Sequence, residues 1–199
     1  MSAGSFQIET PRMFLQPWES HDWEEFRPIT QDPLVLRYVS EGTPWPEKRI
    51  IEFVARQRRH FERYGHCFWK ILLKANGRLG GFCGLQPLED FTNDGKAVGF
   101  LHDREAVDFA GVEIGWWLAS DLWGTGLATE AARAALADGF HRVGLARIVA
   151  LALKENRASL RVMEKLGMQY EKDATHRGYS VAQYAIGKSR FAEFSPPGV

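Results

Sequence analysis

Two glycines, Gly124 and Gly126, separate an apolar segment at 112–118 from an amphipathic segment that begins at Gly126. Glycine reaches backbone conformations that a Cβ blocks, and it lets an anion approach the main chain closely. If a helix begins here, the N–H groups of residues 124–129 lie at its positive, unpaired end, which suits a diphosphate. A tight turn without a ligand explains the two glycines equally well. Their spacing matches neither the dinucleotide motif G-x-G-x-x-G nor the G-K-[ST] of a P-loop.

The turn must be held by the element before it and the element after it. The β-branched, aromatic and aliphatic residues at 112–118 predict a strand. An apolar stripe with a 3.6-residue period predicts a helix over 126–143, which Gly144 ends. The sequence therefore predicts a strand, a glycine turn and a helix in direct succession.

Hydrophobic periodicity also indicates the other elements. Apolar residues spaced by three or four positions predict an amphipathic helix over 47–64, ended by Gly65. The pair Asn76-Gly77 is typical of a hairpin turn, and Pro28 and Pro33 are typical of a loop. Such an alternation predicts a mixed sheet flanked by helices. Further strands are expected at 6–16, 67–73, 79–85, 147–153, 168–171 and 181–186, and further helices at 19–26, 34–39 and 156–166.

The length of 199 residues suits one domain, which we expect to span 1–199. Polar and mixed residues predict an extended loop at 88–111 between core strands, a place where functional segments often lie. The prolines and glycine at 195–199 predict a loose tail.

The composition argues against several classes of protein. With 25 basic and 25 acidic residues the net charge is zero, which argues against broad binding to nucleic acid. Two isolated cysteines, Cys67 and Cys83, form neither a zinc motif nor a disulfide framework, so no metal is expected. No signal peptide and no apolar run long enough to span a membrane are visible, so the expected location is the cytoplasm.

Four segments contain motifs that are informative together. Residues 8–15 contain E-T-P-R-M, residues 79–85 read L-G-G-F-C-G-L, residues 123–128 read W-G-T-G-L-A, and residues 156–168 contain N-R-A-S followed by E-K-L-G-M. In this order, over nearly the whole chain, they resemble the GNAT N-acetyltransferase superfamily and its RimJ/RimL-like branch. Many members have Gln or Arg where this chain has Trp123.

The resemblance implies an α+β GNAT fold, with a central mixed, mostly antiparallel sheet of six to seven strands flanked by helices. It implies acetyl-coenzyme A as cosubstrate, with its pantetheine arm lying along the strand at 112–118 and its diphosphate on the glycine turn. Asn156 would both cap a helix and bond the arm. The cofactor-binding residues implied are Trp117, Leu118, Ala119, Trp123, Gly124, Thr125, Gly126, Leu127, Ala128, Thr129 and Asn156.

The resemblance also suggests catalytic groups. Glu113 is the first choice for the base that deprotonates the amine, because apolar neighbours on its strand are able to raise the pKa of its carboxyl group. A structural ion pair or an exposed position fits Glu113 equally well. Three rivals, His102, Asp103 and Glu105, lie in the long loop.

The departing thiolate needs a proton, and many members of the superfamily provide it from a tyrosine. Here that position is Met163, which cannot donate a proton. RimL-like enzymes carry a serine three residues after the asparagine, and Ser159 has this place. Its alternative role is that of a residue in the first turn of a helix.

The resemblance thus predicts transfer of an acetyl group to a primary amine, on a protein N-terminus or a small molecule, by direct attack in a ternary complex. A homodimer is possible by resemblance only. One alternative is a non-catalytic coenzyme A-binding module, which Met163 and Trp123 favour. Another is an unrelated nucleotide-binding enzyme that uses the glycine turn for a different phosphate.

Overall fold

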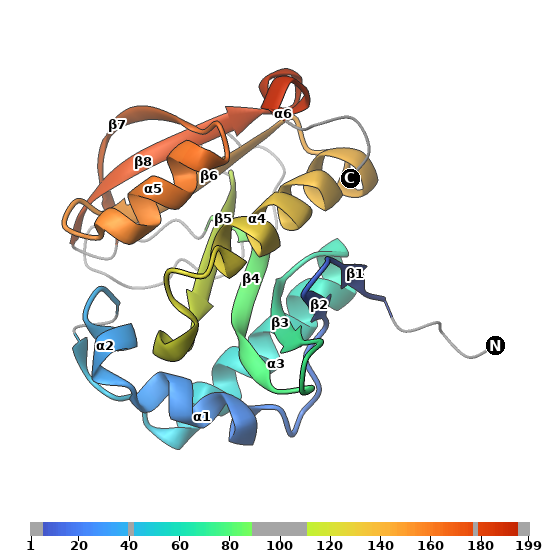
Figure 1. Cartoon of the computed structure of the whole chain (residues 1–199), viewed down its shortest axis with the longest axis vertical. Helices are drawn as coiled ribbons and strands as arrows, with labels where there is room; N and C mark the ends of the chain where they lie inside the picture. The colour runs from blue at the N-terminus through green and yellow to red at the C-terminus, as the bar shows by residue number, and fades with distance from the viewer. Residues whose placement is uncertain (1–5, 40–41, 89–110, 177–178, 195–199) are drawn as a thin grey trace. The chain divides into compact units, whose positions relative to one another are not determined.

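The computed structural model describes residues 6–39, 42–88, 111–176 and 179–194, and their elements are shown in Figure 1. The chain divides into two compact units, which we call the first unit (1–85 and 114–144) and the second unit (86–113 and 145–199). At the ends of the expected 88–111 loop, the N–H of Leu88 donates to the carbonyl of Gly111 (2.7 Å). The expected tail at 195–199 and the candidate bases His102, Asp103 and Glu105 lie outside the described residues.

The strands of the first unit follow one another in the order β1-β2-β3-β4-β5, and the pairs β1–β2, β2–β3 and β3–β4 are antiparallel. Gly81 in β4 lies so close to β5 that a Cβ would come 2.0 Å from the carbonyl oxygen of Trp117. This contact explains the glycine at position 81. The strands are β1 (Ile8–Glu9), β2 (Met13–Gln16), β3 (Phe68–Leu73), β4 (Leu79–Pro87) and β5 (Val112–Leu118).

The single strand predicted over 6–16 is wrong, because the chain folds here into a tight hairpin. The N–H of Thr10 donates to the carbonyl of Met13 (2.9 Å), and the Thr10 hydroxyl oxygen accepts from the N–H of Met13 (3.0 Å). Pro11 lies at a turn position that suits its fixed φ. As a result β1 and β2 pair with each other, with Ile8 opposite Leu15.

The helices of the first unit include one that matches its prediction and one that does not. α3 spans Glu47–Tyr64 as predicted, and it ends at Gly65 with φ of 71°. The helix predicted at 19–26 is shifted, since α1 spans Trp23–Gln31 and contains Pro28, which the sequence places in a loop. Burial of Phe26 and Ile29 outweighs the missing hydrogen bond at the proline. The other helices are α2 (Pro33–Leu36), the 3₁₀ turn η2 (Ser120–Leu122), and α4 (Leu127–Asp138), which continues into the π-helical turn η3 (Gly139–Val143).

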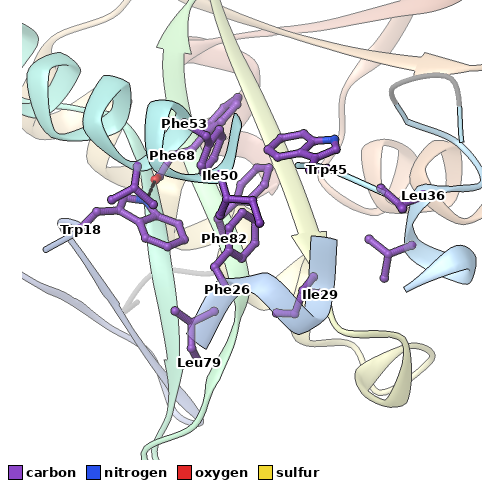
Figure 2. Close-up of a cluster of buried hydrophobic side chains, with 12 residues drawn as sticks. Trp18, Phe26, Ile29, Leu36, Trp45, Ile50, Phe53, Phe68, Leu79 and Phe82 are labelled. Carbon is purple, nitrogen blue, oxygen red and sulfur yellow. Dashed lines mark hydrogen bonds between the residues drawn. The ribbon is translucent and has the colours of Figure 1, made fainter. Parts of the chain in front are cut away.

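An aromatic core holds these elements together, as Figure 2 shows. Phe26 of α1, Phe53 of α3 and Phe82 of β4 lie in mutual ring contact, with centroids 5.2–6.0 Å apart. The indole N–H of Trp18 donates to the carbonyl of Phe68, which satisfies a polar group inside the core. Figure 1 shows α1 and α3 side by side, and the aromatic core fixes both relative to β4.

In the second unit the strand order is β6-β8-β7, with antiparallel pairs, and Glu113 at the start of β5 lies opposite Val149 of β6 in a parallel pair. The expected number of six to seven strands is therefore too low for the described residues, which form eight. β6 has its predicted bounds, whereas β7 and β8 are longer and α6 was not predicted. The elements are β6 (Arg147–Leu153), α5 (Arg157–Lys165), β7 (Gln169–His176), β8 (Tyr179–Gly187) and α6 (Lys188–Phe194).

β7 extends beyond its predicted end by antiparallel pairing with β8, with Asp173 opposite Ala182 and Thr175 opposite Ser180. Its exposed Glu171 pairs with Arg147 of β6, and its exposed Asp173 accepts from Lys154 (2.6 Å). Along the part of the chain that the structure describes, no helix is both long and apolar enough to cross a membrane.

Candidate active site

The predicted strand, glycine turn and helix are present in direct succession in the first unit. β5 ends at Leu118, η2 follows, and α4 begins at Leu127. Gly124 and Gly126 have φ of 75° and 84°, in the left-handed region that residues with a Cβ rarely adopt. Space does not explain the glycine at 124, because nothing lies within 4 Å of the place its Cβ would take. The conformation of the turn therefore requires glycine.

The backbone N–H groups of residues 124–129 form the candidate phosphate cradle. The first helical hydrogen bond of α4 runs from the N–H of Glu130 to the carbonyl of Gly126 (3.1 Å). Within the described residues, no hydrogen bond outside the regular ladders uses any of the six N–H groups before it. Unpaired N–H groups at a helix start, together with the helix dipole, bind anions.

The side chains of the predicted cofactor-binding residues differ in their surroundings. Trp123 and Thr125 are exposed, and the Thr125 hydroxyl donates to the carbonyl of Leu122 (2.6 Å). Leu127 is buried, whereas Ala128 and Thr129 are half-buried. The exposed part of the turn thus combines the side chains of Trp123 and Thr125 with the bare backbone of the two glycines.

The end of β5 already uses two of the backbone groups that the sequence assigns to the pantetheine arm. The N–H of Ala119 donates to the carbonyl of Gly80 (3.0 Å), and the carbonyl of Leu118 accepts from the indole N–H of Trp123 (2.9 Å). The Trp117 ring packs against Trp45, with centroids 5.0 Å apart. Trp123 therefore ties the turn to the strand before it.

A cluster that the sequence analysis missed lies beside the cradle. Glu130 accepts from the Thr10 hydroxyl (2.8 Å), the Arg12 N–H (3.0 Å) and Arg12 Nε (2.7 Å). Arg12 Nη1 also donates to the carbonyl of Thr125 (2.9 Å). Partial burial by itself raises the pKa of the Glu130 carboxyl, but the hydrogen bonds from Thr10 and Arg12 outweigh it and hold the pKa below its usual value. The E-T-P-R segment at 9–12 was the available signal.

Asn156 and Ser159 lie together in the second unit. Asn156 Oδ1 accepts from the N–H of Ser159 (3.1 Å), so the predicted cap of α5 is confirmed. Both residues are half-buried, and the described residues offer the Ser159 hydroxyl no hydrogen-bond partner. Met163, which stands where many members have a tyrosine, is 1% exposed and belongs to the core.

Glu113 also belongs to the second unit. It is half-buried at the start of β5, and its Oε1 accepts from Gln86 Nε2 (2.6 Å). Because Gln86 is buried, its hydrogen bond holds the Glu113 carboxylate in one position. Between the described residues of β5 and β6, Glu113 and Val149 form the only backbone pair.

The described residues thus contain the cradle with Arg12 in the first unit, and Glu113, Asn156 and Ser159 in the second. In the same described part of the chain, no group of three or more His, Cys, Asp or Glu side chains is placed to hold a metal ion.

Comparison with known proteins identifies the family of the chain. The acetyltransferase (GNAT) domain family matches residues 12–169. YkkB of Bacillus subtilis (strain 168) is 31% identical over 179 residues, which cover 89% of this chain and 94% of YkkB. The uncharacterized N-acetyltransferase YoaA of the same organism is 37% identical over 164 residues, which cover 82% of this chain and 83% of YoaA.

A solved structure shows the same fold. The GNAT-family acetyltransferase from Bacillus anthracis has a TM-score of 0.71 at 26% identity, over 92% of this chain and 99% of the relative. The GNAT fold expected from the sequence is therefore confirmed.

Proposed function

The chain belongs to the GNAT acetyltransferase family and is an acetyl-coenzyme A-dependent acyltransferase; we propose that it acetylates a primary amine by direct attack in a ternary complex. The observation that carries the proposal is the row of N–H groups at 124–129, after β5 and η2, for which the described part of the chain shows no partner. These groups are complementary to the diphosphate of coenzyme A, and β5 leads from them toward Glu113.

In this proposal the cradle binds the diphosphate, and backbone groups of Trp117, Leu118 and Ala119 bind the pantetheine arm as an added strand. Because the Leu118 carbonyl and the Ala119 N–H are already paired, the arm uses the backbone groups that remain on this segment. Trp123 contributes by fixing the end of β5 rather than by touching a phosphate. Asn156 binds the arm with side-chain polar atoms that are not used in capping α5.

The chemical step needs one base and one acid. The protonated amine loses one proton to Glu113, directly or through water, and its neutral nitrogen then attacks the thioester carbonyl carbon. As the amide forms, its nitrogen releases a second proton to solvent. The C–N bond forms, the C–S bond breaks, and the sulfur leaves as a thiolate. The Ser159 hydroxyl hydrogen-bonds the sulfur and supplies its proton, directly or through water, and is reprotonated from solvent. Holding the two reactants together supplies much of the acceleration.

We assign the enzyme to the RimJ/RimL-like branch, on the strength of the E-T-P-R and N-R-A-S segments. The acceptor is then a protein N-terminus or a small-molecule amine. We also propose that it works in the cytoplasm, where acetyl-coenzyme A is plentiful and where two buried, unpaired cysteines stay reduced. A homodimer is the assembly that the resemblance suggests.

The test is to incubate the protein with acetyl-coenzyme A and a panel of amines, with free thiol as the readout. The panel should include N-terminal peptides of ribosomal proteins, polyamines and amino sugars. At least one amine should raise thiol release well above hydrolysis. If none does while coenzyme A still binds tightly, the chain is a non-catalytic coenzyme A-binding module instead.

Two variants then test the assigned groups with the acceptor found. Glu113→Gln should lower kcat by about 100-fold or more and remove the acidic limb of the pH profile, because a general base contributes about 10²–10⁴-fold. Ser159→Ala should lower kcat and leave KM for acetyl-coenzyme A nearly unchanged. Ser180→Ala, at an exposed position of β8, is the matched control. An unchanged kcat in either variant removes that residue from the mechanism.

A further inference from the structure

Arg12 connects three parts of the first unit through one side chain. It lies in the turn between β1 and β2, and its Nε donates to Glu130 in the first turn of α4 (2.7 Å). Its Nη1 donates to the carbonyl of Thr125 inside the glycine turn (2.9 Å). The planar guanidinium makes the two bonds from two different nitrogens in fixed directions, whereas the donors of an ammonium group all lie on one atom.

The bond to Thr125 sets the orientation of one peptide group in the cradle. In a trans peptide the C=O and the following N–H point in opposite directions. Because Arg12 holds the Thr125 carbonyl, the N–H of Gly126 points away from Arg12, to the side where a ligand is able to approach. Arg12 Nη2 lies 3.6 Å from the place that a Cβ of Gly126 would take, so the guanidinium backs directly onto this peptide.

Arg12 also compensates the charge around the cradle. Residues 119–129 include no Lys or Arg, and their one ionisable side chain, Asp121, accepts from Arg78 (2.7 Å). The Glu130 carboxylate, one turn into α4, would repel a diphosphate if it were left uncompensated. The hydrogen bonds from Thr10 and Arg12 keep its pKa low, so the carboxylate stays ionised and keeps hold of Arg12.

We propose that Arg12 is a positioning residue for the coenzyme A diphosphate: it orients the Thr125–Gly126 peptide toward the ligand and offsets the charge of Glu130. The inference rests on the proposed function, since it requires the diphosphate to bind at the cradle. It assigns to the N-terminal hairpin a part in cofactor binding, although the hairpin is far from the cradle in sequence.

The test measures Kd for coenzyme A and for pantetheine, which lacks the diphosphate, by calorimetry. Arg12→Gln should raise Kd for coenzyme A about tenfold or more, which is the loss expected for a hydrogen bond to a charged group. Kd for pantetheine should change less than twofold. Arg12→Lys keeps the charge but loses the fork, so it should restore less than half of the lost binding free energy.

The matched control is Arg78→Gln. Arg78 is another exposed arginine near the turn, and it donates to the side chain of Asp121 and not to cradle backbone. This variant should bind coenzyme A as the wild type does. The amide NMR signal of Gly126 should shift on adding coenzyme A to the wild type and clearly less in Arg12→Gln.

The outcomes separate the two proposals. If the wild-type protein does not bind coenzyme A, the proposed function fails and this inference fails with it. If the wild type binds but Arg12→Gln binds within twofold of it, only the inference fails. Full recovery in Arg12→Lys would show that charge alone acts, and would overturn the positioning role.

Discussion

Cys67 and Cys83 are both completely buried in the first unit. Burial raises the pKa of both thiols well above the ordinary value, and the charge of Arg142 opposes this only in part at Cys67. Since the thiolate is the reactive form, the native protein should not react with an aromatic disulfide reagent at pH 8. After unfolding in urea, two thiols per chain should titrate.

This property is useful in the activity assay, because the same disulfide reagent measures the coenzyme A thiol that acetyl transfer releases. The folded enzyme should contribute no background to that assay. Cys83→Ala provides the control, since its unfolded chain should titrate one thiol. Rapid titration of the native wild type would contradict the buried placement of these residues.

At the residue scale, the sequence was informative where partners are neighbours along the chain. The capping of α5 by Asn156 depends on Ser159, three residues away, and it was predicted. The contacts of Arg12 to Thr125 and Glu130 span more than 100 residues, and no local spacing encodes them. The motif at 9–12 was visible, but only the folded hairpin shows that it supports the cradle.

At the scale of elements, a buried ion pair connects β3 to the start of α1. Lys70 Nζ donates to both carboxylate oxygens of Asp22 (3.0 and 2.8 Å), and both side chains are less than 10% exposed. Lys70→Met leaves the Asp22 charge buried without its cation, which costs about 3–5 kcal/mol of unfolding free energy. Urea denaturation measures the loss.

The double variant Lys70→Met with Asp22→Asn removes both charges, so it should recover a large part of the stability that Lys70→Met loses. Equal losses in the single and the double variant would contradict this account. The N–H of Glu19 still has an acceptor at position 22 in the double variant, because asparagine keeps a carbonyl oxygen.

The buried face of α3 makes stability depend on pH. His60 is 1% exposed, and burial first, then the charge of Arg56, lowers its pKa to about 4. In the unfolded chain the pKa of histidine is about 6.5, so below that pH the unfolded state binds the proton first. Stability therefore falls as the pH drops from about 6.5 toward 4.

Between pH 7 and pH 5 this effect of His60 should lower the unfolding free energy by about 1–2 kcal/mol. The variant His60→Gln has no such group and should lose less over the same interval, as urea denaturation at the two pH values would show. His66, whose pKa burial also lowers, acts in both proteins and cancels in the comparison. Identical losses in both proteins would contradict a neutral, buried His60.

Elements were predictable where local signals and tertiary packing agree. α3 has a regular apolar stripe and a left-handed glycine at its end, and both bounds were predicted. α1 carries Pro28, a local signal for a loop, but the aromatic core around Phe26 outweighs it. β7 gave a weak signal because its exposed charged residues pair with partners on other elements.

At the scale of the whole molecule, the net charge is zero and the pI is near 7.0. The protein therefore has no overall charge that attracts an anionic ligand, and any electrostatic attraction comes from local groups. Electrostatic attraction of coenzyme A then depends on the charged groups and N–H groups at the cradle, and not on the net charge of the protein. This explains why composition argued against broad binding to nucleic acid but gave no information on the amine acceptor. Side chains distant in sequence define an acceptor site, and local patterns do not encode them.

Binding of coenzyme A should stabilise the whole chain. A ligand at 100 times its Kd adds about 2.7 kcal/mol to the unfolding free energy, which corresponds to about 5–10 °C in Tm for a domain of this size. Differential scanning fluorimetry with and without coenzyme A measures the shift. NAD or ATP at the same concentration should give a much smaller one, and the reverse order would favour a different nucleotide-binding enzyme.

Two glycine variants connect this shift to the cradle. Gly126→Asp places a Cβ 3.6 Å from Arg12 Nη2, so its carboxylate should compete with Thr125 and Glu130 for Arg12. It also adds negative charge beside the cradle, and repulsion of the diphosphate should remove most of the shift in Tm. Gly144→Asp is the matched control, because Gly144 also has a left-handed φ, of 81°, at a helix terminus and lies in open space. Both variants should lose similar intrinsic stability, but only Gly126→Asp should lose the response to coenzyme A. A normal response in Gly126→Asp would mean that the diphosphate binds elsewhere.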